Sequence, residues 1–224
     1  MRRLSNSIKK TETIMKRIII PIIITAVLLG CAPKAQNETA PAPNKGEILT
    51  EILNARKSIR KFAEDKPVTD DIMLDILWAA NGINREDGRR TAPSAVNAQD
   101  IVMYVCKEDG TYLYKPQTEE LEKISGTDVR PIIASFNKFA LTNPVVLLCS
   151  DYSKFARFSP EAAAKYGAMD AGYVSQNIYI YCAANNMATV ACAPGMDNKA
   201  VQEALLLPET MVPLIYHPVG YPAE

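Results

Sequence analysis

The sequence feature that most constrains the fold is a long helical segment in the second half of the chain. Ser159-Pro160-Glu161 supplies an N-cap hydroxyl, a proline for the first turn and an early acid, and the helix that it opens is predicted to extend to Asn185. Each glycine in a helix interior costs about 1 kcal/mol relative to alanine. Close approach by another helix, a partner subunit or a flat ligand would account for that cost, and a helix crossing inside one core accounts for it equally well. The interior of this predicted helix contains two such glycines, Gly167 and Gly172, together with the small residues Ala168 and Ala171.

Strand and helix patterns alternate in the rest of the chain. Pro144–Cys149 is a continuous apolar run of strand length, which is typical of a central strand buried on both faces. Ile101–Cys106 predicts another strand, and Asp109-Gly110 predicts a hairpin turn after it. Thr69, followed by two acids, predicts the start of a helix that stops at Asn81-Gly82.

The remaining segments complete the predicted fold. A first helix begins near residue 47 and runs into the segment 56–60, and the other predicted elements are helices over 117–124, 132–141 and 197–206 and strands over 111–114, 188–193 and 212–217. The polar segment 91–99 between them has the composition of a site loop. The chain is therefore predicted to be α+β, with a central mixed, mainly antiparallel sheet flanked by helices.

The amino terminus is predicted to be a targeting signal and not part of the folded domain. Lys16-Arg17 precedes an apolar run over 18–30, which is shorter than the roughly 20 residues that span a bilayer. The run ends in Leu28-Leu29-Gly30-Cys31, which resembles a bacterial lipobox. We therefore expect residues 1–31 to be a lipoprotein signal peptide with Cys31 acylated, residues 32–46 a flexible tether, and residues 47–224 the folded domain. An ordinary secretory signal with an incidental cysteine is the alternative.

Composition excludes several classes of function. Beyond residue 31 the chain has 19 basic and 24 acidic residues, a net charge of −5 that gives no reason to expect a nucleic-acid partner. Metal-ligand spacing and glycine-rich phosphate loops are both missing from the sequence. We expect the single histidine, His217, to be structural or at the surface, and the four remaining cysteines to be buried thiols, although disulfides stay possible. A chain so poor in acid-base side chains suits chemistry carried by a bound cofactor.

The segment Ala55–Arg60 concentrates three cations and a hydroxyl in six residues. If Arg56 and Arg60 continued the preceding helix they would share one face, where like charges four residues apart cost a few tenths of a kcal/mol. An anion bound there would offset this repulsion. A solvated charged face is the alternative.

Taken together, these motifs resemble the nitroreductase family of FMN-dependent oxidoreductases. Segments over 77–82 and 112–114 are most similar to the branch that includes the azoline dehydrogenases of peptide biosynthesis. The resemblance covers residues 47–222 and rests on the order of its motifs: Arg56-x-Ser58-x-Arg60, the run from Ala92 to Gln99, Gly172 with Gln176-Asn177, Asp197 with Leu207-Pro208, and Pro218 to Pro222.

The resemblance implies where FMN binds and how the protein assembles. The phosphate and ribityl chain would contact Arg56, Lys57, Ser58 and Arg60, since guanidinium groups form charge-assisted bonds to a dianion. The isoalloxazine would contact Pro93, Ser94, Ala95 and Asn97, from the second subunit of an intertwined homodimer. Flavin N5 would face the backbone of Ala193, Pro194 and Gly195. No side chain is implied to be catalytic.

One departure from the family pattern concerns the carboxyl end. Many members complete the phosphate site there with a lysine or arginine, but this chain has no basic residue after Lys199. Arg56 and Arg60 would then supply most of the neutralising charge. The expected function is a ping-pong oxidoreductase that passes electrons from a small donor to a nitroaromatic, a quinone or a similar acceptor, on the outer side of a bacterial membrane. The alternative is a membrane-anchored protein that binds a flavin or another small ligand without turnover.

Overall fold

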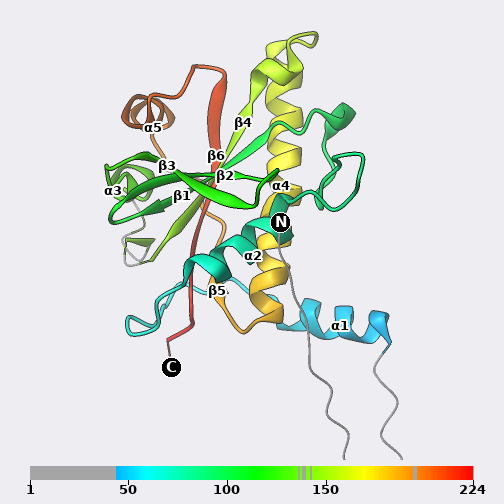
Figure 1. Cartoon of the computed structure of the whole chain (residues 1–224), viewed down its shortest axis with the longest axis vertical. Helices are drawn as coiled ribbons and strands as arrows, with labels where there is room; N and C mark the ends of the chain where they lie inside the picture. Colours follow the sequence, from blue (N-terminus) through cyan, green and yellow to red (C-terminus); the bar gives the residue numbers. More distant parts are fainter. Residues whose placement is uncertain (1–43, 136, 138–139, 142, 194–195, 224) are drawn as a thin grey trace, which may run out of the picture. The chain divides into compact units, whose positions relative to one another are not determined.

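The computed structural model in Figure 1 alternates helices with strands, and it describes residues 44–135, 137, 140–141, 143–193 and 196–223. The predicted signal peptide with Cys31 and most of the predicted tether lie outside the described residues. The helices are α1 Lys45–Ala55, α2 Asp70–Asn81, α3 Arg130–Ile133, α4 Pro160–Ala184 and α5 Asn198–Leu205, with 3₁₀ turns η1 Ala95–Asn97 and η3 Tyr152–Phe155. The strands are β1 Ile101–Lys107, β2 Gly110–Lys115, β3 Glu120–Ser125, β4 Val145–Asp151, β5 Ala188–Thr189 and β6 Met211–Gly220.

The strands form one sheet in the order β3-β2-β1-β4-β6-β5, and each described pair is antiparallel. In the central strand β4, Leu148 packs in a cluster with residues of α2 and α4, whereas Leu147 packs on the other face with residues of α3 and α5. Because helices cover both faces, the run Val145–Cys149 of this strand is continuously apolar and does not alternate with polar residues. The predicted α+β class with a helix-flanked sheet is confirmed.

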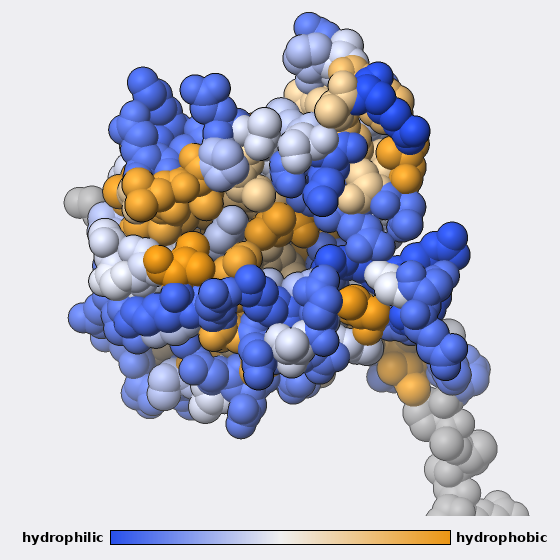
Figure 2. All heavy atoms as spheres, turned by 45° about the horizontal axis from the view of Figure 1, so that its top comes forward, coloured by the Kyte–Doolittle hydropathy of each residue, from blue (hydrophilic) through white to orange (hydrophobic). Residues whose placement is uncertain are grey.

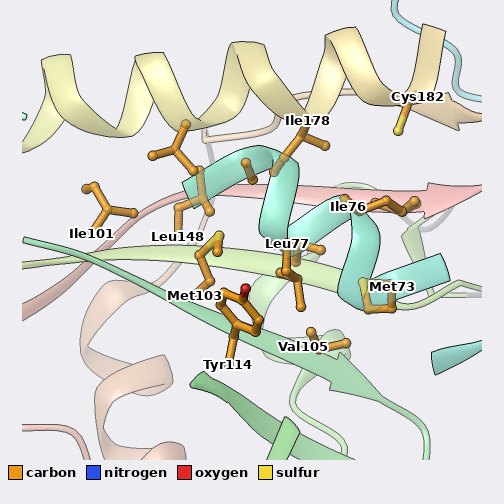
Figure 3. Packing of buried hydrophobic residues seen from close by; sticks show 14 of the residues in the cluster. Met73, Ile76, Leu77, Ile101, Met103, Val105, Tyr114, Leu148, Ile178 and Cys182 are labelled. Carbon is orange, nitrogen blue, oxygen red and sulfur yellow. The ribbon is translucent and has the colours of Figure 1, made fainter. Parts of the chain in front are cut away.

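The long helix α4 has its predicted bounds. Ser159 Oγ accepts a hydrogen bond from the Ala162 amide at 3.3 Å, and Asn185 forms the C-cap. The helix packs against α2 and the sheet, and Figure 3 shows Ile178 of α4 close to Leu148 and Leu77 in this core. α4 also contacts Ser58 and Ala95, which belong to two of the three segments that the sequence assigned to a ligand.

The two glycines of α4 serve different purposes. A Cβ at Gly167 would come within 2.5 Å of Ser150 Oγ, so the missing side chain lets α4 lie directly on β4. Gly172 is exposed, and a Cβ there would have no described atom within 4 Å. Gly167 therefore fits a crossing inside one core, and Gly172 lies on the outward face.

The predicted helix over 117–124 is wrong, because most of this segment is the strand β3. Leu121 and Ile124 have the three-residue spacing of a helix face, but Ile124 is 38% exposed and only Leu121 packs against the core. Glu119 adopts a left-handed backbone with φ of 55°, which turns the chain back along β2. Pairing with the free edge of β2 decides the structure here.

The other discrepancies are in element length. The helix predicted over 132–141 is the four-residue α3, whose C-cap Ala134 already leaves helical geometry, and part of the range lies outside the described residues. The strand predicted over 188–193 is reduced to Ala188–Thr189, with Cys192 in an isolated bridge to Tyr216. The hairpin at Asp109-Gly110, the helix after Thr69 and the last strand are confirmed.

Helix α1 buries none of its own residues. A capping box between Asn44 and Glu47 starts it, and Ile48, Leu49 and Leu53 are 42%, 48% and 47% exposed. Helices shorter than about 12 residues are marginal in water without a packing partner. This apolar face is therefore unlike the core-facing stripe of α2.

The four cysteines beyond residue 31 are free and buried, as expected, and burial raises the pKa of Cys106 and Cys182 to about 12. Across the described ranges, no helix combines the length and apolarity needed to cross a bilayer.

Candidate functional site

The cationic segment 56–60 is extended and not helical. Helix α1 ends at Ala55, and Arg56 has φ of −62° and ψ of 119°. The Ile59 amide donates to Thr189 O at 3.0 Å and ties the segment to β5. The expectation that Arg56 and Arg60 share a helix face is therefore wrong, because pairing with β5 straightens the chain.

Three cations of this segment are available for an anion. Lys57 and Arg60 are exposed and Arg56 is half-buried, and within the described part of the chain none of the three forms an ion pair with a carboxylate. Arg60 lies near enough to Cys192 to affect the pKa of that thiol. The segment therefore faces the turn that follows β5, where the predicted N5-contacting residues begin. Ala193 is exposed there, and Pro194 and Gly195 lie outside the described residues.

Tyr179 of α4 joins these parts, and the sequence analysis missed it. Its hydroxyl accepts a hydrogen bond from the Ala191 amide at 2.8 Å and lies 2.8 Å from Ser58 Oγ. The Arg56 guanidinium lies over its ring, 5.2 Å from the centroid, in cation–π geometry. One tyrosine thus holds the cationic segment and the backbone after β5 together.

Replacing Tyr179 with phenylalanine is expected to lower the free energy of unfolding by about 1–3 kcal/mol, because the half-buried Ala191 amide loses its acceptor. Urea denaturation measures this. Tyr173→Phe, at an exposed tyrosine of the same helix, is the control and should change stability by less than about 0.5 kcal/mol. Equal effects of the two variants would contradict the role given to Tyr179.

His217 is structural, and it is buried in β6 instead of lying at the surface. Thr189 Oγ1 donates to Pro218 O at 3.0 Å, so its contact with His217 Nδ1, also 3.0 Å, requires a proton on Nδ1. Nε2 then accepts from Ser175 Oγ at 2.8 Å. Burial lowers the pKa of His217 to about 3, which keeps the ring neutral.

The loop 93–97 contains the 3₁₀ turn η1 and is anchored by hydrogen bonds. Both carboxylate oxygens of Asp170 in α4 accept from the Ala95 amide, at 3.0 and 2.8 Å, and Ser94 Oγ accepts from the Gln99 amide at 2.9 Å. Val96 and Asn97 have φ of 50° and 55°, which is unusual for a β-branched residue and typical of functional loops. Pro93 and Asn97 are exposed.

The structure brings together some predicted site residues and not others. Arg56, Ser58 and the backbone near Ala193 meet around Tyr179, but the loop contacts α4 at Asp170. Nine residues of helix separate these two positions, a rise of about 13.5 Å. Within one chain the two halves of the candidate site therefore lie at separate places along α4.

Residues 53–221 match the family model described as the nitroreductase family. A protein of Methanocaldococcus jannaschii named as a candidate nitroreductase is 30% identical over 189 residues, which cover 79% of this chain and 92% of that protein. The crystal structure of a candidate nitroreductase from Ralstonia eutropha is 27% identical with a TM-score of 0.72, over 79% of this chain and 83% of that one. A chain of the E. coli microcin synthetase complex is similar in fold, with 16% identity and a TM-score of 0.63, over 73% of this chain and 68% of that one.

Proposed function

The chain belongs to the nitroreductase family, and from this premise we propose that it is an FMN-dependent oxidoreductase. A small donor and then a small acceptor, such as a nitroaromatic or a quinone, would use the same flavin face in a ping-pong cycle. We place it beside the azoline dehydrogenases on the motifs described above. The bound flavin supplies the two-electron chemistry, and the chain supplies binding and orientation.

The observation that carries this proposal is the set of three cations without carboxylate partners among the described residues, beside an exposed backbone segment. A phosphate dianion fits Arg56, Lys57 and Arg60, and Ser58 adds a hydroxyl. Arg56 is already oriented by the ring of Tyr179. The backbone of Ala193, Pro194 and Gly195 is the segment that the family resemblance would bring to flavin N5.

We further propose that the active form is a homodimer in which Pro93, Ser94, Ala95 and Asn97 of one subunit complete the site of the other. The separation of the two half-sites along α4 supports this. So do the exposed apolar face of α1 and the outward stripe of α4, where Met169 and Tyr173 are 47% and 46% exposed. Figure 2 shows separate apolar patches of this kind breaking a hydrophilic surface. Contact between two copies would bury such residues.

We propose that Cys31 carries the lipid that anchors the protein to the outer side of a bacterial membrane. The support is the sequence alone: a basic pair, a short apolar run, a lipobox-like end and a polar tether. Because an exported protein has no obvious supply of NAD(P)H, a quinol is a candidate electron donor beside the pyridine nucleotides.

The protein expressed from residue 32 onward is expected to be yellow, to release FMN on denaturation, and to be reduced anaerobically by a pyridine nucleotide or a quinol. The described residues form one compact unit, so this version should fold. Absorbance at the flavin bands before and after each donor measures both properties. Colourless protein that FMN cannot reconstitute would contradict the proposal, and yellow protein that no donor reduces would favour a binding protein without turnover.

A further inference from the structure

Two buried carboxyl groups lie beneath the loop 93–97. Asp100, which directly precedes β1, is fully buried, and Asp170 of α4 is 1% exposed. They approach each other because Gly167, three residues before Asp170, lets α4 lie against Ser150 of β4. Ser150 donates to Asp100 Oδ2 and lies against α4 at Gly167, one turn before Asp170, so the two carboxyl groups are neighbours.

The hydrogen bonds assign different states to the two groups. Asp170 accepts from the Ala95 amide with both oxygens, which suits a carboxylate. Asp100 Oδ2 accepts from the Ser150 hydroxyl, but Asp100 Oδ1 is buried and has no partner among the described atoms. No cation pairs with either group in the described ranges. A proton on Oδ1 would give that oxygen a partner, because it could then donate to Asp170.

We propose that Asp100 and Asp170 share one proton, and that this proton keeps Asp170 bound to the Ala95 amide and so fixes the loop 93–97 in its ligand-binding conformation. Both are positioning residues, since neither needs to touch the ligand. The ligand part of this inference rests on the proposed FMN site. The loop needs such an anchor because Val96 and Asn97 adopt left-handed backbone conformations that a free chain would leave.

The electrostatics support a proton at this place. The pKa of Asp100 is raised to about 7: burial is the largest cause, the bond from Ser150 opposes it, and the neighbouring Asp170 acts in the same direction as burial. The other titratable group facing Asp100 is Tyr152 of η3, whose pKa is raised mainly by its own burial and then by Asp100. Among the described residues, no positively charged group contributes to the pKa shift of Asp100.

The sign of the pH dependence follows. The folded protein holds this proton up to about pH 7, whereas an unfolded aspartate releases it near 3.8. Its stabilising effect is complete below about pH 4 and is lost as pH rises through 7. Above that, two adjacent buried carboxylates repel each other, and the bond that holds Ala95 weakens. His217 acts in the opposite direction, because its neutral form is favoured in the fold and its contribution is lost as pH falls.

The variant Asp100→Asn tests the proposal, because its carboxamide can accept from Ser150 and donate permanently to Asp170. We would titrate FMN into the full-length protein in detergent at pH 6 and pH 8.5 and follow flavin fluorescence. The ratio of wild-type to variant Kd is expected to be near 1 at pH 6 and about 10 at pH 8.5. At about 1.5 pH units above the pKa, the loss of one proton can weaken binding by at most roughly 30-fold, so the expected ratio lies within this limit. Using the ratio cancels the titration of the FMN phosphate itself.

Thermal unfolding of the same two proteins without FMN provides a readout that does not need the flavin site. Between pH 6 and pH 8.5 the wild type should lose Tm relative to Asp100→Asn. Asp65→Asn, at an exposed aspartate, is the control and should follow the wild type in both measurements. Identical pH profiles of wild type and Asp100→Asn would overturn the shared proton. If neither protein binds FMN but the Tm difference is present, the proposed flavin site is rejected and the proposed shared proton is supported.

Discussion

Arg56→Ala is expected to raise the Kd for FMN by about 10- to 150-fold while the protein stays folded. Hydrogen bonds to charged groups contribute about 1.5–3 kcal/mol each, and the chain has no basic residue after Lys199 to compensate for a lost guanidinium. Arg56 is the C-cap of α1 through its backbone, and its half-buried side chain stacks on Tyr179, so its removal should leave the core intact. Flavin content after gel filtration and a fluorescence titration measure the effect.

Two further variants make this prediction specific. Arg56→Lys keeps the charge but loses the planar fork and much of the stacking, so its Kd should fall between those of the wild type and Arg56→Ala. Lys199→Ala removes a cation from an exposed position on α5 and should leave the Kd unchanged. Unaltered flavin content in Arg56→Ala would sink the assignment of the phosphate to this segment.

The second large effect is expected from Leu49→Glu combined with Leu53→Glu on the exposed face of α1. If a second copy covers this face, each buried charge without a partner costs about 3–5 kcal/mol, and the dissociation constant of the dimer should rise by at least about 100-fold. When the second subunit dissociates, its loop 93–97 no longer completes the site, so flavin should be lost as well. Sedimentation velocity and flavin absorbance on the same samples measure both changes.

Thr50→Glu with Asn54→Glu is the matched control, because it adds the same charge to exposed polar positions of the same helix. The control should remain dimeric and yellow. A monomeric wild type that retains flavin would contradict the proposed sharing of the site. A dimer that survives the leucine substitutions would show that α1 is not part of the contact.

Elements whose signals are local could be predicted from the sequence. The N-caps Thr69 and Ser159 and the Asp109-Gly110 turn each specify their structure within a few residues, and all three are confirmed. The strand β3 and the end of α1 depend instead on distant partners, β2 and Thr189. Helical spacing alone cannot show that an open strand edge competes for a segment.

The same division holds for the candidate site. The cationic motif and the loop composition are visible in the sequence, but Tyr179 and Asp170 are not. Ser58 lies 121 residues from Tyr179, and Ala95 lies 75 residues from Asp170, so only the folded chain shows these pairs. The residues next to Asp170 and Tyr179 in the sequence do not indicate which distant residues these two side chains contact.

The close contact at Gly167 also restricts how this helix can vary in sequence. A side chain at residue 167 would overlap Ser150, so the close packing of α4 on the sheet requires glycine at this position. Asp170 and Tyr179 lie on the same continuous helix, so a movement of one along the sheet also moves the other. One residue inserted between them would turn the following part of the helix by about 100° and shift it by about 1.5 Å. Substitutions can therefore diversify this family member's site, but a change in the length of α4 between residues 170 and 179 would alter the spacing and relative orientation of its two halves.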